Sequence, residues 1–278
     1  MSVKIDPTEF RLMRDYIEQQ CGIHVGDEKM YLVETRLTTL MAEQGCSDFR
    51  ELHRKALSDS SNKLRDKIVD AMTTNETLWF RDSAPFTILR SVLKEMAEDL
   101  NAGKRREIRI WCAACSTGQE PYSIAMLAKE LERQNSKFPP ATVKILATDI
   151  SPTALFLAMS GRYDSFAISR GLSEEYKSRY FSFDGKVWTI DNKIKSMVTF
   201  KKLNLQDRFD NLGKQDIVFC RNVLIYFSDD FKRDILQKIH DMLSPGGLLF
   251  VGASESLMNY SKGYRMIREG RGIYYRKE

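Results

Sequence analysis

The sequence predicts an α/β protein in which an all-helical domain precedes a parallel sheet covered by helices on both faces. Two observations lead to this fold class. The first 80 of the 278 residues carry only helical patterns, whereas from about residue 108 short apolar runs alternate with helices. Such alternation is typical of a parallel sheet, because each helical crossover returns the chain to the same end of the sheet.

Four short amphipathic helices are predicted at the start of the chain. In the first, Asp6 can act as the N-cap, with Pro7 at the first helical position. Each of the others has apolar residues at helical spacing. These three are predicted to begin near Asp27, Ser47 and Ser61. Helices joined by brief loops form a small bundle, which we assign to residues 1–72.

Four short apolar runs that contain branched residues predict the strands of the sheet. They are IRIWCAA (108–114), TVKILATD (142–149), DIVFCRN (216–222) and, after a Ser-Pro-Gly-Gly turn, LLFVGA (248–253). A helix with its own capping residues follows the second run. Ser151 is its N-cap and Pro152 its first helical residue. Two further strand patterns flank a Gly-Arg-Gly turn in residues 264–278, so an antiparallel edge hairpin is predicted to close the sheet.

Residues 180–200 fit neither pattern. Asp-Gly and Asp-Asn turn signals separate strand-like runs there and predict a small β hairpin or meander, inserted before a strand that ends at Phe200. We therefore expect a linker at residues 73–90 and a second domain at 91–278, with a β subdomain at about 178–200.

Composition and charge indicate a globular protein of the cytoplasm. An apolar content of 42% and a charged content of 29% are ordinary for such proteins. No apolar run approaches the roughly 20 residues of a membrane span, and the first residues lack a secretory signal. The five scattered cysteines fit a reducing compartment. Residues 1–80 hold 11 Lys and Arg against 14 Asp and Glu, which leaves a modest net charge of +8 on the rest of the chain.

The loops that follow the predicted strands favour one class of cofactor. In an open parallel sheet, ligands bind beyond the carboxyl ends of the strands. Asp149 lies there and can accept both hydroxyls of a ribose, as in sites for NAD or S-adenosylmethionine (SAM). The preceding loop holds a single glycine, Gly118, and a carboxylate, Glu120. A pyrophosphate needs several glycines and would be repelled by Glu120, whereas SAM is cationic at its sulfonium and amino groups, so SAM is favoured.

Five segments of the chain form a recognisable set. They are TTNETLWFRD (73–82), STGQEPYSIA (116–125), ATDIS (147–151), NL (204–205) and FCRNVLIYF (219–227). Together they resemble the signature of the chemotaxis receptor methyltransferases, the CheR-type family, in the same order and over nearly the whole chain. The resemblance implies a Rossmann-like SAM-methyltransferase sheet and a SAM-dependent protein-glutamate O-methyltransferase that modifies chemoreceptors in bacterial chemotaxis.

The resemblance also implies which residues bind the cofactor. Glu120 would bind the methionyl amino group and Asp149 the ribose. The segment that lies over the cofactor would contribute Asn75, Thr77 and Arg81. The adenosine and the methionyl end would be framed by Asn204, Leu205, Arg221 and Asn222.

Two side chains, Arg81 and Tyr226, would lie nearest the transferred methyl group. A glutamate with a pKa of about 4.3 is already ionised at neutral pH, so the reaction needs no general base. The enzyme contributes alignment of the reactants and removal of water from the nucleophile. Our hypothesis is that Arg81 holds a carboxylate and the Tyr226 hydroxyl orients the acceptor oxygen, which turnover of the Arg81→Ala and Tyr226→Phe variants tests.

Three other functions compete with this interpretation. A nucleic-acid methyltransferase would suit the basic second half, but CRNVLIY stands where amine-methylating enzymes tend to carry an Asn/Asp-Pro-Pro-aromatic motif. A SAM-sensing or scaffold module would share the fold without turnover. Cys112 and Cys115 have the spacing of a zinc or redox pair, but there is no second pair and no nearby histidine, so no metal site is predicted.

Two departures from the family bear on the partner. The second helix reads TRLTTLMAEQG and has Arg36 but lacks the further arginines that are thought to meet the receptor's helical bundle. The β insert is shorter and has fewer glycines than in members that dock on a receptor's C-terminal pentapeptide. We therefore expect the partner to be the cytoplasmic helical bundle of chemoreceptors, without a pentapeptide tether, nucleic-acid binding or membrane insertion.

Overall fold

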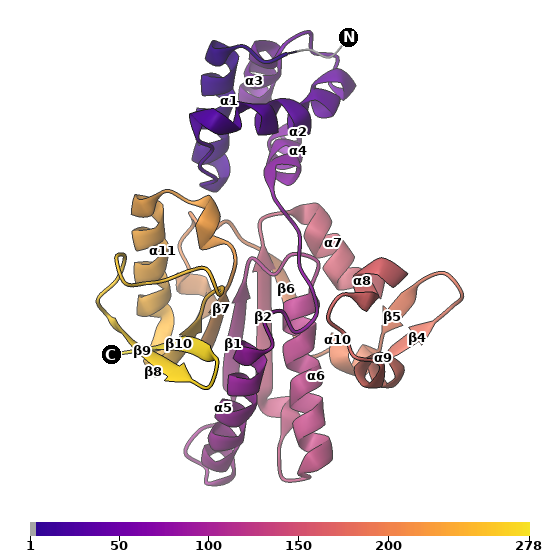
Figure 1. Ribbon diagram of the computed structural model, residues 1–278, viewed down its shortest axis with the longest axis vertical. Coiled ribbons are helices and arrows are strands. Elements are labelled where there is room, and N and C mark those ends of the chain that lie inside the picture. The colour runs from indigo at the N-terminus through magenta and orange to yellow at the C-terminus, as the bar shows by residue number, and fades with distance from the viewer. Residues whose placement is uncertain (1–3) are drawn as a thin grey trace.

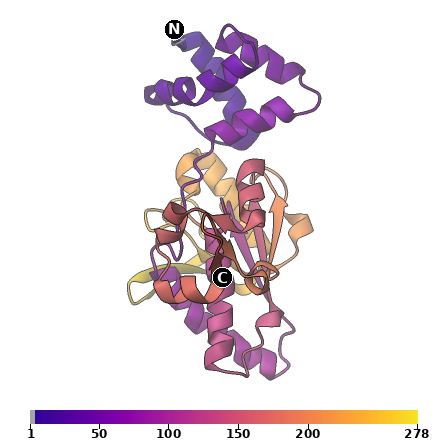
Figure 2. The same ribbon diagram turned by 90° about the vertical axis from the view of Figure 1, so that its right-hand side faces the viewer.

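The computed structural model describes residues 4–278, in which a helical unit is joined by one extended segment to an α/β unit (Figures 1 and 2). The helical unit consists of α1 (Pro7–Cys21), α2 (Met30–Glu43), α3 (Phe49–Ser58) and α4 (Lys63–Met72). All four predicted helices are present, and Asp6 caps α1 in a capping box with Glu9. The second begins at Met30, after a short 3₁₀ turn at the predicted start. Their apolar faces form a core of their own.

A seven-stranded sheet forms the centre of the α/β unit (Figure 1). Its strands are β1 (Ile108–Ala113), β2 (Val143–Asp149), β6 (Val198–Lys202), β7 (Gln215–Cys220), β8 (Leu243–Phe250), β9 (Tyr264–Glu269) and β10 (Gly272–Lys277). The order is β6-β2-β1-β7-β8-β10-β9, with β10 antiparallel to both neighbours. The predicted parallel sheet and its antiparallel edge hairpin are therefore confirmed. The predicted Ser-Pro-Gly-Gly turn loops out of β8 between the residues that pair with Gln215 and Ile217.

Helices cover both faces of the sheet, because successive strand residues point to opposite sides. Ile110 and Cys112 of β1 pack with α5 (Ala84–Asn101) and α6 (Gln119–Gln134). Trp111 between them packs with α11 (Asp229–Met242) on the other face. Helix α5 was not predicted, and the expected linker boundary at residue 90 lies inside it. No helix among residues 4–278 is long and apolar enough to cross a membrane.

A second, three-stranded sheet lies beside α6 and carries the predicted β insert (Figure 1). It contains β3 (Arg162–Tyr163), β4 (Phe181–Phe183) and β5 (Trp188–Ile190), accompanied by α8 (Ser165–Ser169), α9 (Glu174–Tyr180) and α10 (Asn192–Lys195). Helix α7 (Pro152–Ser160) instead packs against β2 and β6 of the main sheet. The predicted hairpin is β4–β5, and the following strand ends at Lys202 rather than Phe200. The fully buried Trp79 packs edge-on against Tyr163 and Phe181 and thereby anchors the linking segment.

Candidate functional site

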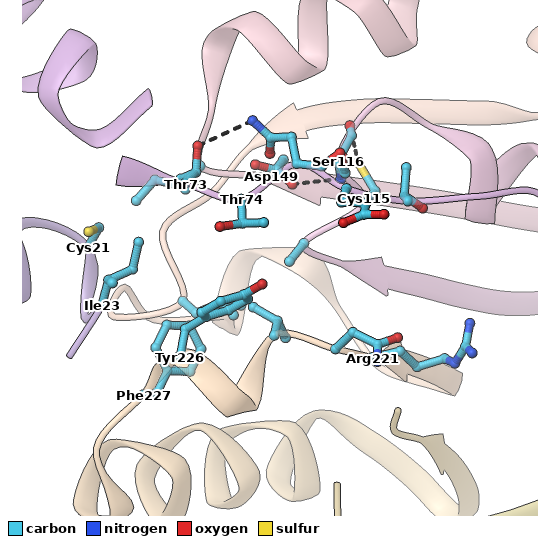
Figure 3. Close-up of a pocket in the computed structure, with 18 of the residues that line it drawn as sticks. Cys21, Ile23, Thr73, Thr74, Cys115, Ser116, Asp149, Arg221, Tyr226 and Phe227 are labelled. Carbon is cyan, nitrogen blue, oxygen red and sulfur yellow. Dashed lines mark hydrogen bonds between the residues drawn. The ribbon is translucent and has the colours of Figure 1, made fainter. Parts of the chain in front are cut away.

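A cavity lies at the carboxyl ends of β1, β2 and β7, beside the end of α1 (Figure 3). The end of α1, the linking segment and the loops after β1, β2, β6 and β7 form its wall. It contains every residue that the sequence singled out for the site. These are Asn75, Thr77, Arg81, Glu120, Asp149, Asn204, Leu205, Arg221, Asn222 and Tyr226. The fold thus gathers side chains from segments far apart in the chain.

Asp149 occupies the end of β2 and is held by two backbone amides. The N–H of Ser116 donates to Oδ2 at 2.7 Å, and the N–H of Ser151 donates to Oδ1 at 2.9 Å. Capping of α7 falls to the Ser151 hydroxyl, which accepts the N–H of Ala154. Burial raises the pKa of Asp149, and the two amides act against that rise. A carboxylate has about four acceptor positions, so the group can still receive hydroxyls from the cavity.

The loop before α6 is shaped by unusual backbone angles. Ala114 and Ser116 have φ values of 57° and 51°, and Gly118 has a φ of 93°. A Cβ on Gly118 would lie 3.0 Å from the Cβ of Ala158, so the position needs glycine for both conformation and space. The strained loop brings the Ser116 amide to Asp149 and Glu120 to the cavity wall.

Glu120 forms a buried charge cluster with Arg221. Nη1 of Arg221 donates to Glu120 Oε2 at 2.9 Å, and Nη2 donates to Asp82 Oδ2 at 2.7 Å. The Arg221 side chain is only 2% exposed. Burial raises the pKa of Glu120, although Arg221 lowers it. One guanidinium therefore faces two carboxylates, and the charge of Arg81 also lowers the pKa of Glu120. Asp82 was not among the predicted residues.

Tyr226 lies across the cavity from Thr74 and Asp149 (Figure 3). Its carbonyl oxygen accepts the N–H of His24 at 2.8 Å, and the neighbouring residue Phe227 forms a β-bridge with Ile23. These contacts seat the end of α1 on the loop that carries Tyr226.

Arg81 lies on the linking segment and is only loosely held. Its Nη1 donates to the Glu76 carbonyl at 3.4 Å, and its side chain is partly exposed in the cavity wall. The guanidinium can therefore pair with an incoming anion. Thr77 lines the same wall.

Asn204 and Leu205 follow β6, and both contact other parts of the protein. The Asn204 amide donates to the carbonyl of Gln20 in α1 at 2.8 Å, and its Oδ1 accepts the Gln206 N–H. Leu205 is buried in the core below α11. Both line the cavity, and their contact with an adenosine stays a prediction. Asn222 differs, because its buried Oδ1 has no hydrogen-bond partner among residues 4–278.

The helical unit supplies lining residues that the sequence did not reveal. Cys21 and Ile23 reach the cavity from the end of α1. Arg36 of α2 donates to the Met72 carbonyl at 2.5 Å and to the Thr74 hydroxyl at 2.9 Å, so it holds the linking segment. No local pattern signals these contacts, because they join segments distant in the sequence.

The Cys112–Cys115 pair lies in the core next to this site. Both residues are buried, and Cys115 lines the cavity. Burial raises the pKa of both thiols, which disfavours the thiolates that zinc binding or disulfide exchange requires. Among residues 4–278 no cluster of three or more His, Cys, Asp or Glu side chains could hold a metal ion.

Known protein families match the chain along almost its whole length. Residues 8–73 match the all-alpha domain of CheR methyltransferase, and residues 75–273 match its SAM binding domain. The chain is 49% identical over 270 residues to chemotaxis protein methyltransferase 1 of Pseudomonas aeruginosa, covering 96% of this chain and 97% of the relative. It is 48% identical to chemotaxis protein methyltransferase Cher2 of Pseudomonas putida over 269 residues, with the same coverage. Identity to chemotaxis protein methyltransferase 1 of Vibrio cholerae is 44% over 278 residues, covering 99% of this chain and 98% of that one.

Proposed function

The chain belongs to the CheR family of SAM-dependent chemotaxis protein methyltransferases, and from this membership we propose that its cavity transfers a methyl group from SAM to glutamate side chains of a chemoreceptor. The observation that carries the proposal is the placement of two carboxylates, Glu120 and Asp149, with Tyr226 and Arg81 around one cavity.

We infer that the carboxylates hold the cofactor. Glu120 would accept hydrogen bonds from the methionyl amino group, and Asp149 would accept them from the ribose hydroxyls. The position of both carboxylates on the cavity wall supports this placement, because SAM is cationic at two groups. The unpartnered Oδ1 of Asn222 supplies a further acceptor beside them. When bound, SAM supplies an electrophilic methyl group on a sulfonium.

Arg81 and Tyr226 would align the acceptor. The receptor glutamate is ionised at neutral pH, so its oxygen can attack directly: a C–O bond forms, the C–S bond breaks, and sulfur keeps the electron pair. Arg81 has one weak contact and is free to hold a carboxylate. The Tyr226 hydroxyl would orient the attacking oxygen. Alignment of this kind accounts for up to about 7–11 kcal/mol of a barrier.

Transfer of labelled methyl from SAM tests the proposal. The protein is incubated with labelled SAM and membranes that contain chemoreceptors, and the labelled band is identified. We expect label on the receptor that mild base releases, since methyl esters are base-labile. Label in added RNA or DNA would favour the nucleic-acid enzyme, and SAM binding without transfer would favour a sensing module.

We also propose that the chain works in the cytoplasm as two domains, with no pentapeptide tether. The separate core of the helical unit supports the division. Strand addition needs a long free edge, whereas the edge strands β3 and β4 of the small sheet have two and three residues. Calorimetry with the receptor C-terminal pentapeptide should therefore detect no binding at micromolar concentrations. Micromolar or tighter binding would contradict this part of the proposal.

A further inference from the structure

One carboxylate outside the cavity holds the loop that carries Asn222 and Tyr226. Oε2 of Glu255, in the loop after β8, accepts the N–H of Asn222 at 2.7 Å and that of Gly252 at 2.6 Å. Its Oε1 accepts the N–H of Ile225 at 3.3 Å. Three backbone donors from two loops thus converge on a single side chain that is itself absent from the cavity wall.

The backbone around this carboxylate is tightly turned and crowded. Asn222 has a φ of 57°, in the left-handed region that asparagine adopts more readily than most residues with a side chain. A Cβ on Gly252 would lie 2.6 Å from Asn222 Nδ2 and 2.7 Å from Glu255 Oε2. A side chain at position 252 would therefore displace the Asn222 amide or the Glu255 carboxylate.

We propose that Glu255 is a positioning residue for methyl transfer, which sets Asn222 toward the cofactor and Tyr226 toward the acceptor. This inference rests on the proposed function. An ionised carboxylate only accepts hydrogen bonds, so it can receive all three N–H groups at once. A glutamine would turn an NH₂ group toward at least one of them and push the loop away.

The Glu255→Gln variant tests this role against Glu132→Gln, a matched control on α6. Within residues 4–278, the Glu132 carboxylate pairs with the Lys129 side chain alone. In Glu255→Gln we expect kcat at saturating SAM to fall about tenfold or more, because small displacements of aligned groups are costly. We expect the SAM dissociation constant, measured by calorimetry, to rise several-fold. Both constants should stay within about twofold of wild type in the control.

A double-mutant cycle separates positioning from general destabilisation. If Glu255 acts through Tyr226, then Tyr226→Phe costs less kcat in the Glu255→Gln background than in wild type, since the hydroxyl is already misplaced. Additive costs, or a folded Glu255→Gln variant with wild-type kcat and SAM affinity, would overturn the proposal. Methyl transfer by the wild-type protein is the reference. Its absence would refute the proposed function, whereas in its presence the variants test the role of Glu255 alone.

Two further measurements cover the case in which Glu255→Gln does not fold. Glu255→Asp keeps the charge but shortens the side chain by one methylene, which moves the carboxylate away from the three N–H groups. We expect kcat to fall in this variant too, but by less than in Glu255→Gln. In the wild-type protein, the amides of Asn222 and Gly252 should be protected from hydrogen exchange. Exchange of both at the rate of an unstructured loop, or an unchanged kcat in Glu255→Asp, would also overturn the proposal.

Discussion

The two carboxylates of the cavity, Glu120 and Asp149, are buried in different ways. Asp149 is held by neutral backbone amides, whereas Glu120 is held by the guanidinium of Arg221. Burial nevertheless raises the pKa of Asp149 above its usual value of 3.8 and that of Glu120 above its usual value of 4.5. Their charge is therefore lost at a higher pH than that of surface carboxylates.

A pH dependence follows for cofactor binding. We expect the SAM dissociation constant to rise as the pH falls from neutrality toward the raised pKa values of these two carboxylates, because protonation removes the negative charge that attracts the cation. Stability of the cofactor-free protein changes in the opposite sense: the contribution of these two groups is present at low pH and is lost as the pH rises through their raised pKa values. Calorimetric titration across this range tests the first statement. A flat dissociation constant would contradict it.

The Tyr226 hydroxyl is expected to act on turnover and not on cofactor affinity. In Tyr226→Phe we expect kcat to fall about tenfold, as for loss of about 1.4 kcal/mol of transition-state stabilisation. The SAM dissociation constant should stay unchanged. Tyr260→Phe is the matched control, since that hydroxyl donates to Asp229 away from the cavity. Full turnover in both Tyr226→Phe and Arg81→Ala would contradict their assigned roles.

At the scale of elements, the start of α7 joins the cavity to the helical unit. The hydroxyl of Ser151 accepts the Ala154 N–H and donates to the Asp70 carboxylate of α4. Thr153 donates to the same carboxylate. Ser151 thus caps α7 in the α/β unit and also contacts the helical unit.

Loss of this cap is expected to lower the free energy of unfolding. Ser151→Ala removes the cap and one donor to Asp70, so we expect destabilisation of about 1–2 kcal/mol, measured by urea unfolding. Ser151→Thr keeps a hydroxyl that can do both and should lose less. Equal losses in the two variants would show that the hydroxyl is not what stabilises α7.

Sequence patterns predicted the main strands and the loops of the cavity, because strand ends in a parallel sheet meet at one edge. They did not predict the order of the strands in the sheet. They did not predict α5, whose start at Ala84 lies in a segment assigned to the linker, or β3, which is too short to show a period. Asp82, Ile23 and Glu255 were missed because their partners are distant in sequence. Such contacts depend on tertiary packing, which local periodicity does not encode.

At the scale of the whole molecule, the helical unit has its own apolar core and meets the α/β unit largely through polar contacts. Lys202 pairs with Asp66 at 2.5 Å, and the Gln206 amide donates to the Glu18 carbonyl at 3.1 Å. Among apolar side chains, Ile23 and Ile150 pack against the core of the helical unit from this boundary. Polar interfaces of this kind hold domains less firmly than a shared core does.

Cofactor binding is therefore expected to couple the two units. Since both line the cavity, we expect calorimetry of the cofactor-free protein to show two unfolding transitions, and saturation with S-adenosylhomocysteine to merge them. At a ligand concentration of about 100 times the dissociation constant, the stabilisation amounts to about 2.7 kcal/mol. A single transition in the cofactor-free protein would contradict this view of the interface.

The tryptophans are unevenly shared between the two units. The three of them, Trp79, Trp111 and Trp188, all follow α4 in the chain, and the first two are fully buried. Fluorescence excited selectively at tryptophan consequently reports on the sheet-bearing unit and not on the four N-terminal helices, whose aromatic emitters are tyrosines such as Tyr16 and Tyr31. Loss of circular dichroism at constant emission would be the optical mark of the helical unit melting alone.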